Sequence, residues 1–390
     1  MSAANRHALA ADSVFDGASV RQDFAVVIEG ERIAAIVPRR ELPKDIPVRR
    51  LPDGAWLAPG FIDVQVNGGG DVLFNDEPSP EGIAAIVAAH RRFGTTALLP
   101  TLISDTAEKM GKALLAVQTM LGRDPSVLGI HFEGPFLSPE KPGVHDPAMI
   151  RGPEPADPAL LTSLRGGVTL VTLAPEAVPA GFIGELAAAG VRVSLGHSMA
   201  TYAQTRAALA EGLTGFTHLF NAMRPLASRE GGPIAAALEC PAARYGLIVD
   251  GVHVAPPMLR LALRGAGRPM LVTDAMPPVG GSRSSFLLFG QKIEMREGRC
   301  ARADGTLAGS ALDMATAVRN SVRLMHLPLQ DAIRLATEAP ARFLGIADRL
   351  GRLAPGYRAD MVALDLDAIR VLATWVAGKE CARMEATSPV

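Results

Sequence analysis

The feature that most constrains the fold is a series of eight short apolar segments, each ending in polar residues. Helix-like patterns separate them, for example EGIAAIVAAHRRF from Glu81 and TYAQTRAALAEG from Thr201. Strands that alternate with helices favour βα units and a parallel sheet. Eight such units over roughly 200 residues fit a (β/α)8 TIM barrel, which typically needs about 250 residues. In chain order the segments are GFIDVQVN, TTALLPTLIS, VLGIHFEGP, VTLVTLAPE, RVSLGHS, GFTHLFNAM, YGLIVDGVHV and PMLVTDAM.

The two ends of the chain predict a second, smaller domain. FAVVIEGERIAAIV contains two β-favouring runs around Glu29-Gly30, a hairpin signal, and ADMVALDLDAIRVLATWVAGKE contains two more with a turn around Asp367. We therefore predict an α/β chain in which residues 58–347 form the barrel and residues 1–57 and 348–390 form a small β-sandwich domain. A β-hairpin insertion is expected near residues 284–304.

Composition excludes several classes of protein. With 48% hydrophobic and 20% charged residues among 390, the chain is globular rather than disordered. A formal net charge of -1 provides no basic field for nucleic acid. The three cysteines, Cys240, Cys300 and Cys381, have no CxxC spacing and fit packing positions in a reducing compartment. The start lacks the apolar core of a leader peptide, and no segment reaches about 18 consecutive apolar residues, so we expect a cytoplasmic protein without a membrane partner.

Polar side chains gather at the carboxyl ends of the predicted strands, where barrel enzymes build their active sites. Five of the eight histidines follow such strands. These polar residues are Asp63 and Gln65 after strand one, His131, Glu133 and His145 at and after strand three, His197 after strand five, His218 and Asn221 after strand six, Asp250 and His253 after strand seven, and Asp274 after strand eight.

Three of these residues form a sufficient ligand set for a divalent metal. A single histidine at a strand end is commonly structural, but Glu133, His197 and His218 supply a carboxylate and two imidazoles from strands three, five and six. A metal with an open position lowers the pKa of a bound water to about 7. Asp274, across the barrel mouth, is then the natural general base.

Two candidate anion contacts are less specific. Arg229 in RPLASREGG reads equally well as a solvated loop cation, and His253 reads equally well as a residue that supports the pocket from behind.

The motifs HFEGPFLSPEKPGVHDP, SLGHS, THLFNAM, VDGVHV, LVTDA, GTLAGS and RLGRLAPGYRADMVALD resemble the N-acetylglucosamine-6-phosphate deacetylase family of the amidohydrolase superfamily. The resemblance implies a barrel with a small domain from both termini and a homodimer. It implies metal-dependent hydrolysis of the acetamide of N-acetyl-D-glucosamine 6-phosphate to D-glucosamine 6-phosphate and acetate. The reaction would serve amino-sugar catabolism or cell-wall recycling.

The resemblance also assigns roles to residues. It makes Glu133, His197 and His218 the metal ligands, Asp274 the catalytic acid/base, and His145 the group that polarises the acetamide carbonyl. Arg229 and His253 would neutralise the phosphate. The full set of implied substrate contacts is Val144, His145, Asn221, Ala222, Arg229, Asp250, Gly251, Val252, His253, Leu307, Ala308, Gly309 and Ser310.

The first strand distinguishes this chain from many amidohydrolases. Where those enzymes carry His-x-His and a second metal, this sequence has Asp63-Val64-Gln65, and an amide oxygen is a weak ligand beside imidazole. We expect one divalent metal per chain, with zinc as the first candidate and iron or another divalent ion as alternatives. Asp63 and Gln65 would then lie behind the metal ligands or in the pocket wall.

Three other functions remain open from the sequence. The first is deacetylation of a related sugar phosphate such as N-acetylgalactosamine 6-phosphate, because the loop SREGGPIAAAL and Met276 depart from the family pattern near the pocket. The second is another amidohydrolase reaction, such as hydrolysis of an N-acyl amino acid, in which Arg229 and His253 would have no anion to bind. The third is a non-catalytic barrel protein, which the joint presence of the metal ligands and Asp274 disfavours.

Overall fold

The computed structural model describes residues 6–383, which form two compact units. The first unit consists of the chain up to Asp63, His90–Ala97 and the chain from Asp313 onward, and the second consists of Val64–Ala89 and Leu98–Leu312. Residues 1–5 and 384–390, the ends of the predicted small domain, lie outside the described part of the chain. The predicted domain boundaries at residues 57/58 and 347/348 stay predictions.

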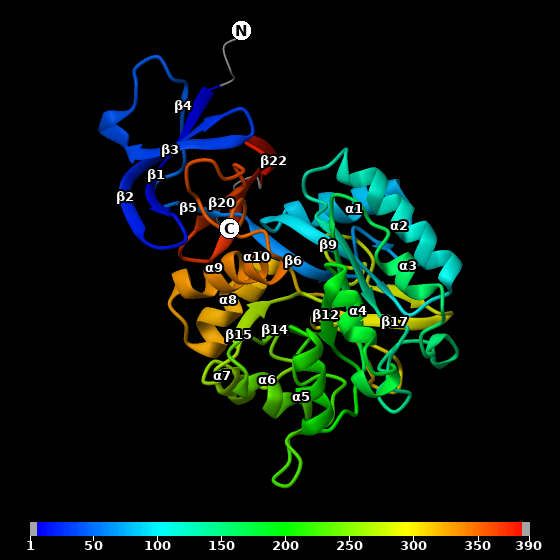
Figure 1. The fold of residues 1–390 in the computed structure, drawn as a ribbon. Coiled ribbons are helices and arrows are strands. Elements are labelled where there is room, and N and C mark those ends of the chain that lie inside the picture. Colours follow the sequence, from blue (N-terminus) through cyan, green and yellow to red (C-terminus); the bar gives the residue numbers. More distant parts are fainter. Residues whose placement is uncertain (1–5, 384–390) are drawn as a thin grey trace. The chain divides into compact units, whose positions relative to one another are not determined.

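The predicted barrel is confirmed as an eight-stranded sheet (Figure 1). Neighbouring strands from β9 to β15 run parallel. Along the sheet, the strands are β15 (Arg268–Leu271), β14 (Arg244–Leu247), β13 (Gly215–Phe216), β12 (Arg192–Leu195), β11 (Val168–Leu173), β10 (Gly129–Glu133), β9 (Thr95–Ile103) and β6 (Phe61–Val66). All eight correspond to the segments predicted from sequence, although several are only two to four residues long.

Backbone hydrogen bonds close the barrel between its first and last strands. Val66 and Ala275 form a parallel bridge. The N–H of Asp274 donates to the carbonyl oxygen of Gln65 at 3.0 Å, and the N–H of Asn67 donates to that of Ala275 at 2.9 Å. This junction between β6 and β15, the seam of the barrel, therefore includes Gln65 and Asp274, which were predicted to lie at the barrel mouth.

Helices follow most barrel strands, as the sequence predicts. The pattern from Glu81 forms α1, and the pattern from Thr201 forms α5. Thr201 and Gln204 make a capping box that fixes where α5 begins. The helices of this part are α1 (Pro80–Arg91), α2 (Ala107–Leu121), α3 (Asp157–Leu161), α4 (Phe182–Ala188), α5 (Tyr202–Glu211), α6 (Gly232–Glu239) and α7 (Pro256–Ala262).

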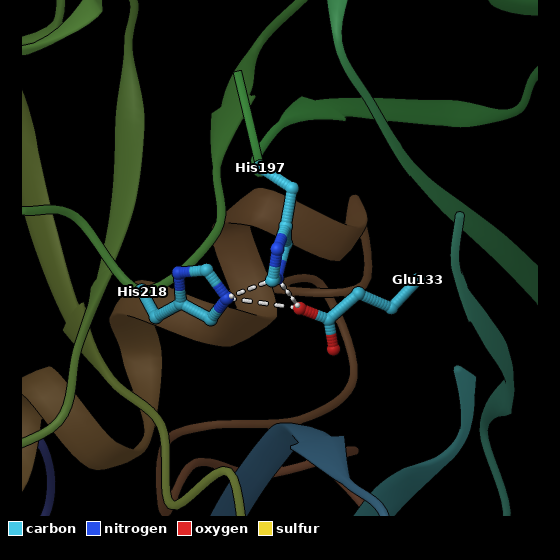
Figure 2. A group of neighbouring side chains, drawn as sticks. All are labelled: Glu133, His197 and His218. Carbon is cyan, nitrogen blue, oxygen red and sulfur yellow. Dashed lines mark hydrogen bonds and ion pairs between the residues drawn. The ribbon is translucent and has the colours of Figure 1, made fainter. Parts of the chain in front are cut away.

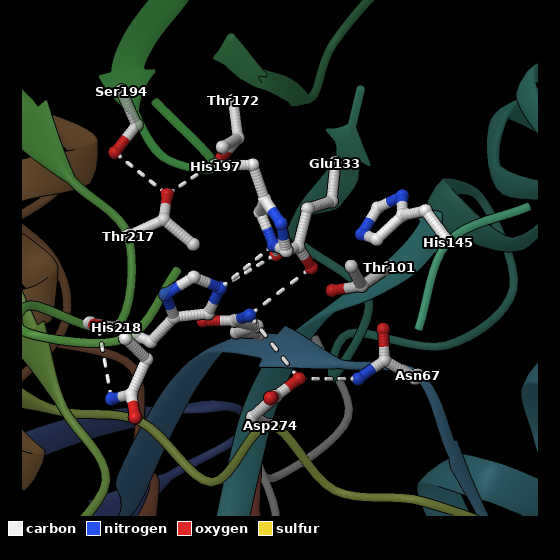
Figure 3. Close-up of polar contacts among 12 residues, drawn as sticks. Asn67, Thr101, Glu133, His145, Thr172, Ser194, His197, Thr217, His218 and Asp274 are labelled. Carbon is white, nitrogen blue, oxygen red and sulfur yellow. Dashed lines mark hydrogen bonds and ion pairs between the residues drawn. The ribbon is translucent and has the colours of Figure 1, made fainter. Parts of the chain in front are cut away.

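A chain of hydrogen-bonded side chains runs through the barrel interior, and Figure 3 shows its part from Thr172 through Thr217 to Ser194. The Nε2 of His131 lies 2.7 Å from the Thr172 hydroxyl, which lies 2.6 Å from that of Thr217. Thr217 in turn donates to Ser194 at 2.9 Å, and the Nδ1 of His131 lies 3.2 Å from the Thr101 hydroxyl. Because these five side chains are hydrogen-bonded to one another, the apolar barrel interior tolerates their burial.

Both ends of the chain enter one eight-stranded sheet, which confirms the predicted small β domain. The predicted hairpins appear as β2–β3 and β20–β21. The path along the sheet is β22 (Lys379–Arg383), β21 (Arg370–Val376), β20 (Met361–Asp365), β5 (Trp56–Pro59), β1 (Arg6–Phe15), β2 (Val20–Glu29) and β3 (Arg32–Pro38), with β4 (Val48–Arg50) pairing with β1.

The long strand β1 was not predicted. Its residues alternate between two apolar clusters: Leu9 and Ala11 belong to one, and Ala8 and Ala10 to the other. A strand that is apolar on both faces shows no polar/apolar alternation, and its alanines do not favour a strand.

The region of the expected hairpin near residues 284–304 is a four-stranded antiparallel sheet. Its strands are β16 (Ser285–Leu288), β17 (Gln291–Arg296), β18 (Arg299–Ala301) and β19 (Leu307–Ser310). A short hairpin, β7 (Gly68–Gly69) with β8 (Val72–Leu73), follows β6. The first unit also contains α8 (Met314–Met325), α9 (Leu329–Ala336) and α10 (Glu338–Leu344). Within residues 6–383, no helix combines the length and apolar character needed to cross a membrane.

Candidate active site

Glu133, His197 and His218 converge at the carboxyl ends of three barrel strands (Figure 2). Glu133 is the last residue of β10. His197 comes two residues after the end of β12, and His218 comes two residues after the end of β13. The Nε2 atoms of the two imidazoles lie 3.1 Å apart and at 3.0 and 2.9 Å from one oxygen of Glu133. All three side chains are buried.

The arrangement of these atoms fits a bound cation. The Nδ1 of His197 lies 2.8 Å from the carbonyl oxygen of Lys141, which can only accept, so Nδ1 carries the hydrogen and Nε2 presents a lone pair. A backbone carbonyl behind a ligating histidine is the usual way to fix this tautomer. Within residues 6–383, no other group of at least three His, Cys, Asp or Glu side chains meets the same geometric requirement.

The charged groups of the cluster shift one another's pKa values. Burial alone would raise the pKa of Glu133, but its contacts with the imidazoles of His197 and His218 hold it well below its usual value. Burial would likewise lower the pKa of His218, and contact with Glu133 raises it instead. Glu133 is therefore an anion, which is the charge that a cation site requires.

The backbone is strained at four non-glycine residues of the predicted site, namely Ala222 and three residues whose side chains converge. His197, His218 and Asp274 have positive φ angles of 48°, 34° and 53°. Residues other than glycine rarely adopt this region, and each such residue typically costs about 1–3 kcal/mol. Strain at three converging side chains points to a functional site rather than to structural capping.

Asp274 lies beside the cluster and is held through one oxygen (Figure 3). Its Oδ1 accepts hydrogen bonds from Asn67 Nδ2 at 2.6 Å and from Gln65 Nε2 at 3.2 Å. Burial, followed by the charge of Glu133, raises the pKa of Asp274 to about 6. A carboxyl group with this pKa can exchange protons near neutral pH.

The polar residues predicted on the first barrel strand differ in their contacts with the site. Gln65 donates to both Glu133 Oε2, at 3.1 Å, and Asp274, so it links the cation cluster to the acid. Asp63 is buried on the same strand but belongs to the first compact unit. Asn67 continues the alternation Asp63, Gln65, Asn67 and was not predicted as a site residue, although this period of two predicts a shared face.

A cavity at the barrel mouth joins most of the predicted residues. His145 lies against His197, with ring centroids 4.5 Å apart, and burial followed by the charge of His197 lowers its pKa to about 3. The predicted residues that line the cavity are Glu133, Val144, His145, His197, His218, Asn221, Ala222, His253, Asp274, Leu307 and Gly309. Met276, which was predicted to lie near the pocket, also lines the cavity, and the lining residues that were not predicted are Asn67, Ile103, Gly143 and Ile248.

Other predicted residues do not line this cavity. Asp250 instead accepts from His253 Nδ1 at 2.6 Å and from the His253 backbone N–H, and so holds this ring at the cavity wall. The N–H of Ser310 donates to the carbonyl oxygen of Asp274 at 2.9 Å. The predicted residues outside the cavity lining are Asp63, Gln65, Arg229, Asp250, Gly251, Val252, Ala308 and Ser310.

Comparison with known proteins identifies the class. The model of the amidohydrolase family matches residues 56–384, and the model of the NagA composite domain matches residues 7–57. The chain belongs to the amidohydrolase family, whose members are metal-dependent hydrolases, and the Glu133, His197 and His218 group is able to bind a metal.

The similar proteins carry two closely related names. N-acetylgalactosamine-6-phosphate deacetylase of Shewanella sp. (strain ANA-3) is 45% identical over 87% of this chain and 86% of its own length. N-acetylglucosamine-6-phosphate deacetylase of Haemophilus influenzae is 37% identical over 96% of this chain and 99% of its own. The crystal structure of N-acetylglucosamine-6-phosphate deacetylase from Pasteurella multocida has a TM-score of 0.93 and 34% identity, and the match covers 96% and 99% of the two chains. The resemblance inferred from the sequence motifs is confirmed.

Proposed function

We propose that this chain hydrolyses the acetamide of N-acetyl-D-glucosamine 6-phosphate to D-glucosamine 6-phosphate and acetate. The observation that carries the proposal is the convergence of Glu133, His197 and His218 beside Asp274 in one cavity. Relatives with this named activity align with almost the whole chain. The second candidate substrate is N-acetyl-D-galactosamine 6-phosphate, because the Shewanella enzyme named for it is 45% identical.

One divalent metal per chain would be held by Glu133, His197 and His218, with zinc as our first assignment and iron as the alternative. When bound, the metal supplies a Lewis acid that polarises the acetamide carbonyl and acidifies a water molecule. Gln65 directs its amide nitrogen toward Glu133 and Asp274, which supports one metal rather than two. Measured stoichiometry should be one per chain. Two metals per chain, one of them lost in Gln65→Ala, would contradict this assignment.

The protein groups carry the proton transfers. Asp274 accepts a proton from the attacking water and returns it to the amine nitrogen as the C–N bond breaks. Asn67 and Gln65 both donate to Oδ1 of Asp274, which leaves Oδ2 as the oxygen that takes the proton. His145 lies in the cavity beside His197 and would polarise the carbonyl oxygen of the substrate.

The phosphate end of the substrate would face His253 and Arg229. Two backbone N–H groups and the ring of His253 all bind Asp250, which supports His253 as a fixed contact. Asp250, Gly251, Val252, Ala308 and Ser310 would then act by shaping the loops around the cavity. We also propose a cytoplasmic homodimer that needs no nucleic-acid or membrane partner.

The decisive experiment measures acetate release by protein loaded with one equivalent of zinc. The substrates are N-acetylglucosamine 6-phosphate, its galactosamine isomer and the two unphosphorylated sugars. Turnover should be highest with the glucosamine phosphate and at least tenfold lower without phosphate, since a charge-assisted contact is worth about 1.5–3 kcal/mol. Faster turnover of the galactosamine phosphate would select the second candidate. Release of acetate from neither phosphate would reject both.

A further inference from the structure

We propose that Ser104 is a positioning residue that holds His145 in the tautomer with its hydrogen on Nε2, so that His145 donates into the cavity. The inference rests on the proposed function only for the identity of the acceptor, the carbonyl oxygen of the acetamide. The tautomer itself follows from hydrogen bonds within the chain.

Two groups of Ser104 meet one ring nitrogen of His145. The backbone N–H of Ser104 donates to Nδ1 at 3.2 Å, and the hydroxyl oxygen lies 2.8 Å from the same nitrogen. A backbone N–H can only donate, so Nδ1 must present its lone pair. The hydroxyl is then a second donor to it. A neutral imidazole has a single N–H, which must therefore be on Nε2.

His197, the ring in contact with His145, is fixed in the opposite way. The Nδ1 of His197 donates to the carbonyl oxygen of Lys141 at 2.8 Å, which leaves a lone pair on Nε2. The tautomer of His197 can therefore ligate a metal through Nε2, whereas the tautomer of His145 can donate a hydrogen bond from Nε2. The cluster that fits a cation contains His197 and His218 but not His145.

The surroundings of Ser104 hold it firmly in place. The side chain of Asn75 binds both backbone groups of Ile103, accepting from the N–H at 3.0 Å and donating to the carbonyl oxygen at 3.1 Å. Gly134, the central residue of the EGP motif, leaves the space that the hydroxyl occupies, because a Cβ there would overlap Ser104 Oγ. Ser104 itself is 1% exposed, so water does not compete for the bond.

A fixed N–H suits amide hydrolysis better than a mobile one. Negative charge develops on the carbonyl oxygen in the transition state, and a donor that is already oriented stabilises it without reorganisation. The hydroxyl of Ser104 does not touch the substrate in this scheme. It acts through the orientation of His145.

The direct test is the tautomer of His145 in zinc-loaded, 15N-histidine-labelled protein. Long-range 1H–15N correlation spectra distinguish a ring nitrogen that carries a hydrogen from one that does not, and His145→Gln identifies the signals by their loss. We expect a neutral ring with hydrogen on Nε2. Hydrogen on Nδ1, or on both nitrogens at neutral pH, would overturn the inference.

The kinetic test compares Ser104→Ala with Ser321→Ala, another buried serine whose hydroxyl donates only to the helix backbone. Ser104→Ala should lower kcat about tenfold with little change in KM, because one net hydrogen bond is lost and the backbone N–H remains. Ser321→Ala should leave kcat unchanged. An unchanged kcat in Ser104→Ala, or an equal rise in KM, would remove Ser104 from the mechanism. If wild-type protein released no acetate but showed the Nε2 hydrogen, the proposed function would fail while the tautomer stood.

Discussion

The barrel mouth and the terminal sheet bury side chains of opposite character. The mouth encloses Glu133, His197, His218 and Asp274, three of them on strained backbone. The core of the terminal sheet is formed by apolar residues with Trp375. Its left-handed non-glycine residues include the exposed Asp23, the half-buried Ile369 and the buried Ala377, so no charged side chain is both buried and strained among these three. Apolar burial contributes stability, whereas buried charge and strain reduce it. The comparison predicts that substitutions at the mouth change activity and substitutions in the sheet change stability.

The largest effect is expected from His218→Ala. Removing one of three ligands should eliminate tight metal binding and turnover together, because two remaining ligands do not hold a divalent ion in a buried site. Metal content per chain after gel filtration and acetate release measure the two effects. His326→Asn, at an exposed helix end, serves as the control and should retain both. Full metal content in His218→Ala would contradict the assigned ligand set.

Asp274→Asn should lower turnover by about 10²–10⁴-fold, the usual range for loss of a general acid/base. Metal content should stay at the wild-type level, since Asp274 is outside the ligand cluster. Near-normal turnover would show that another group moves the proton.

The same variant should be more stable than the wild type in metal-free protein at pH 7. The folded-state pKa of Asp274, about 6, lies above the usual 3.8, so wild-type stability is lost as pH rises through this interval. One pKa unit corresponds to about 1.4 kcal/mol, and we expect a gain on the order of 3 kcal/mol that disappears below about pH 4. Urea unfolding at both pH values measures it. A variant less stable than the wild type at pH 7 would contradict the prediction that burying the charged form of Asp274 destabilises the folded protein.

Trp375→Ala tests the other region. Trp375 is 2% exposed and Arg49 lies over its ring at 5.1 Å, so truncation should cost about 3–5 kcal/mol of unfolding free energy. Urea unfolding followed through the remaining Trp56 measures this loss, and Trp375→Phe should lose less. Turnover per folded molecule should not change. A tenfold loss of turnover with full metal content would contradict the prediction that substitutions in the terminal sheet change stability and not activity.

The smallest effects come from a matched pair of threonines. Thr172→Val removes hydrogen bonds to His131 and Thr217 and should cost about 1–3 kcal/mol. Thr374→Val should be neutral or stabilising, because its buried hydroxyl has no hydrogen-bond partner within residues 6–383. Thermal unfolding of both variants decides the comparison. Equal losses of stability in the two variants would mean that the hydrogen bonds of Thr172 in the barrel interior do not stabilise the folded protein.

The sequence predicted the barrel because strand and helix patterns alternate strongly, and it predicted the cluster because parallel strands end at one edge. It missed β1, whose two apolar faces and alanines conceal the strand period. It also missed Asn67, which continued a visible alternation. The partnership of Ser104 with His145 could not be predicted, because it joins residues 41 positions apart through a side-chain rotamer and one backbone N–H.

The backbone seam at Asp274 links the integrity of the site to that of the barrel. The N–H of Asp274 bonds the first strand, and its carbonyl oxygen accepts from Ser310, so the proposed acid cannot leave its position while the seam stays closed. Amide hydrogen exchange at Asp274 should therefore be among the slowest in the second unit, because it requires cooperative opening of the barrel rather than local opening of a loop. A circularly permuted chain whose new ends lie within this seam would lose the site, whereas one opened at the exposed Ala189–Gly190 turn before β12 would keep it.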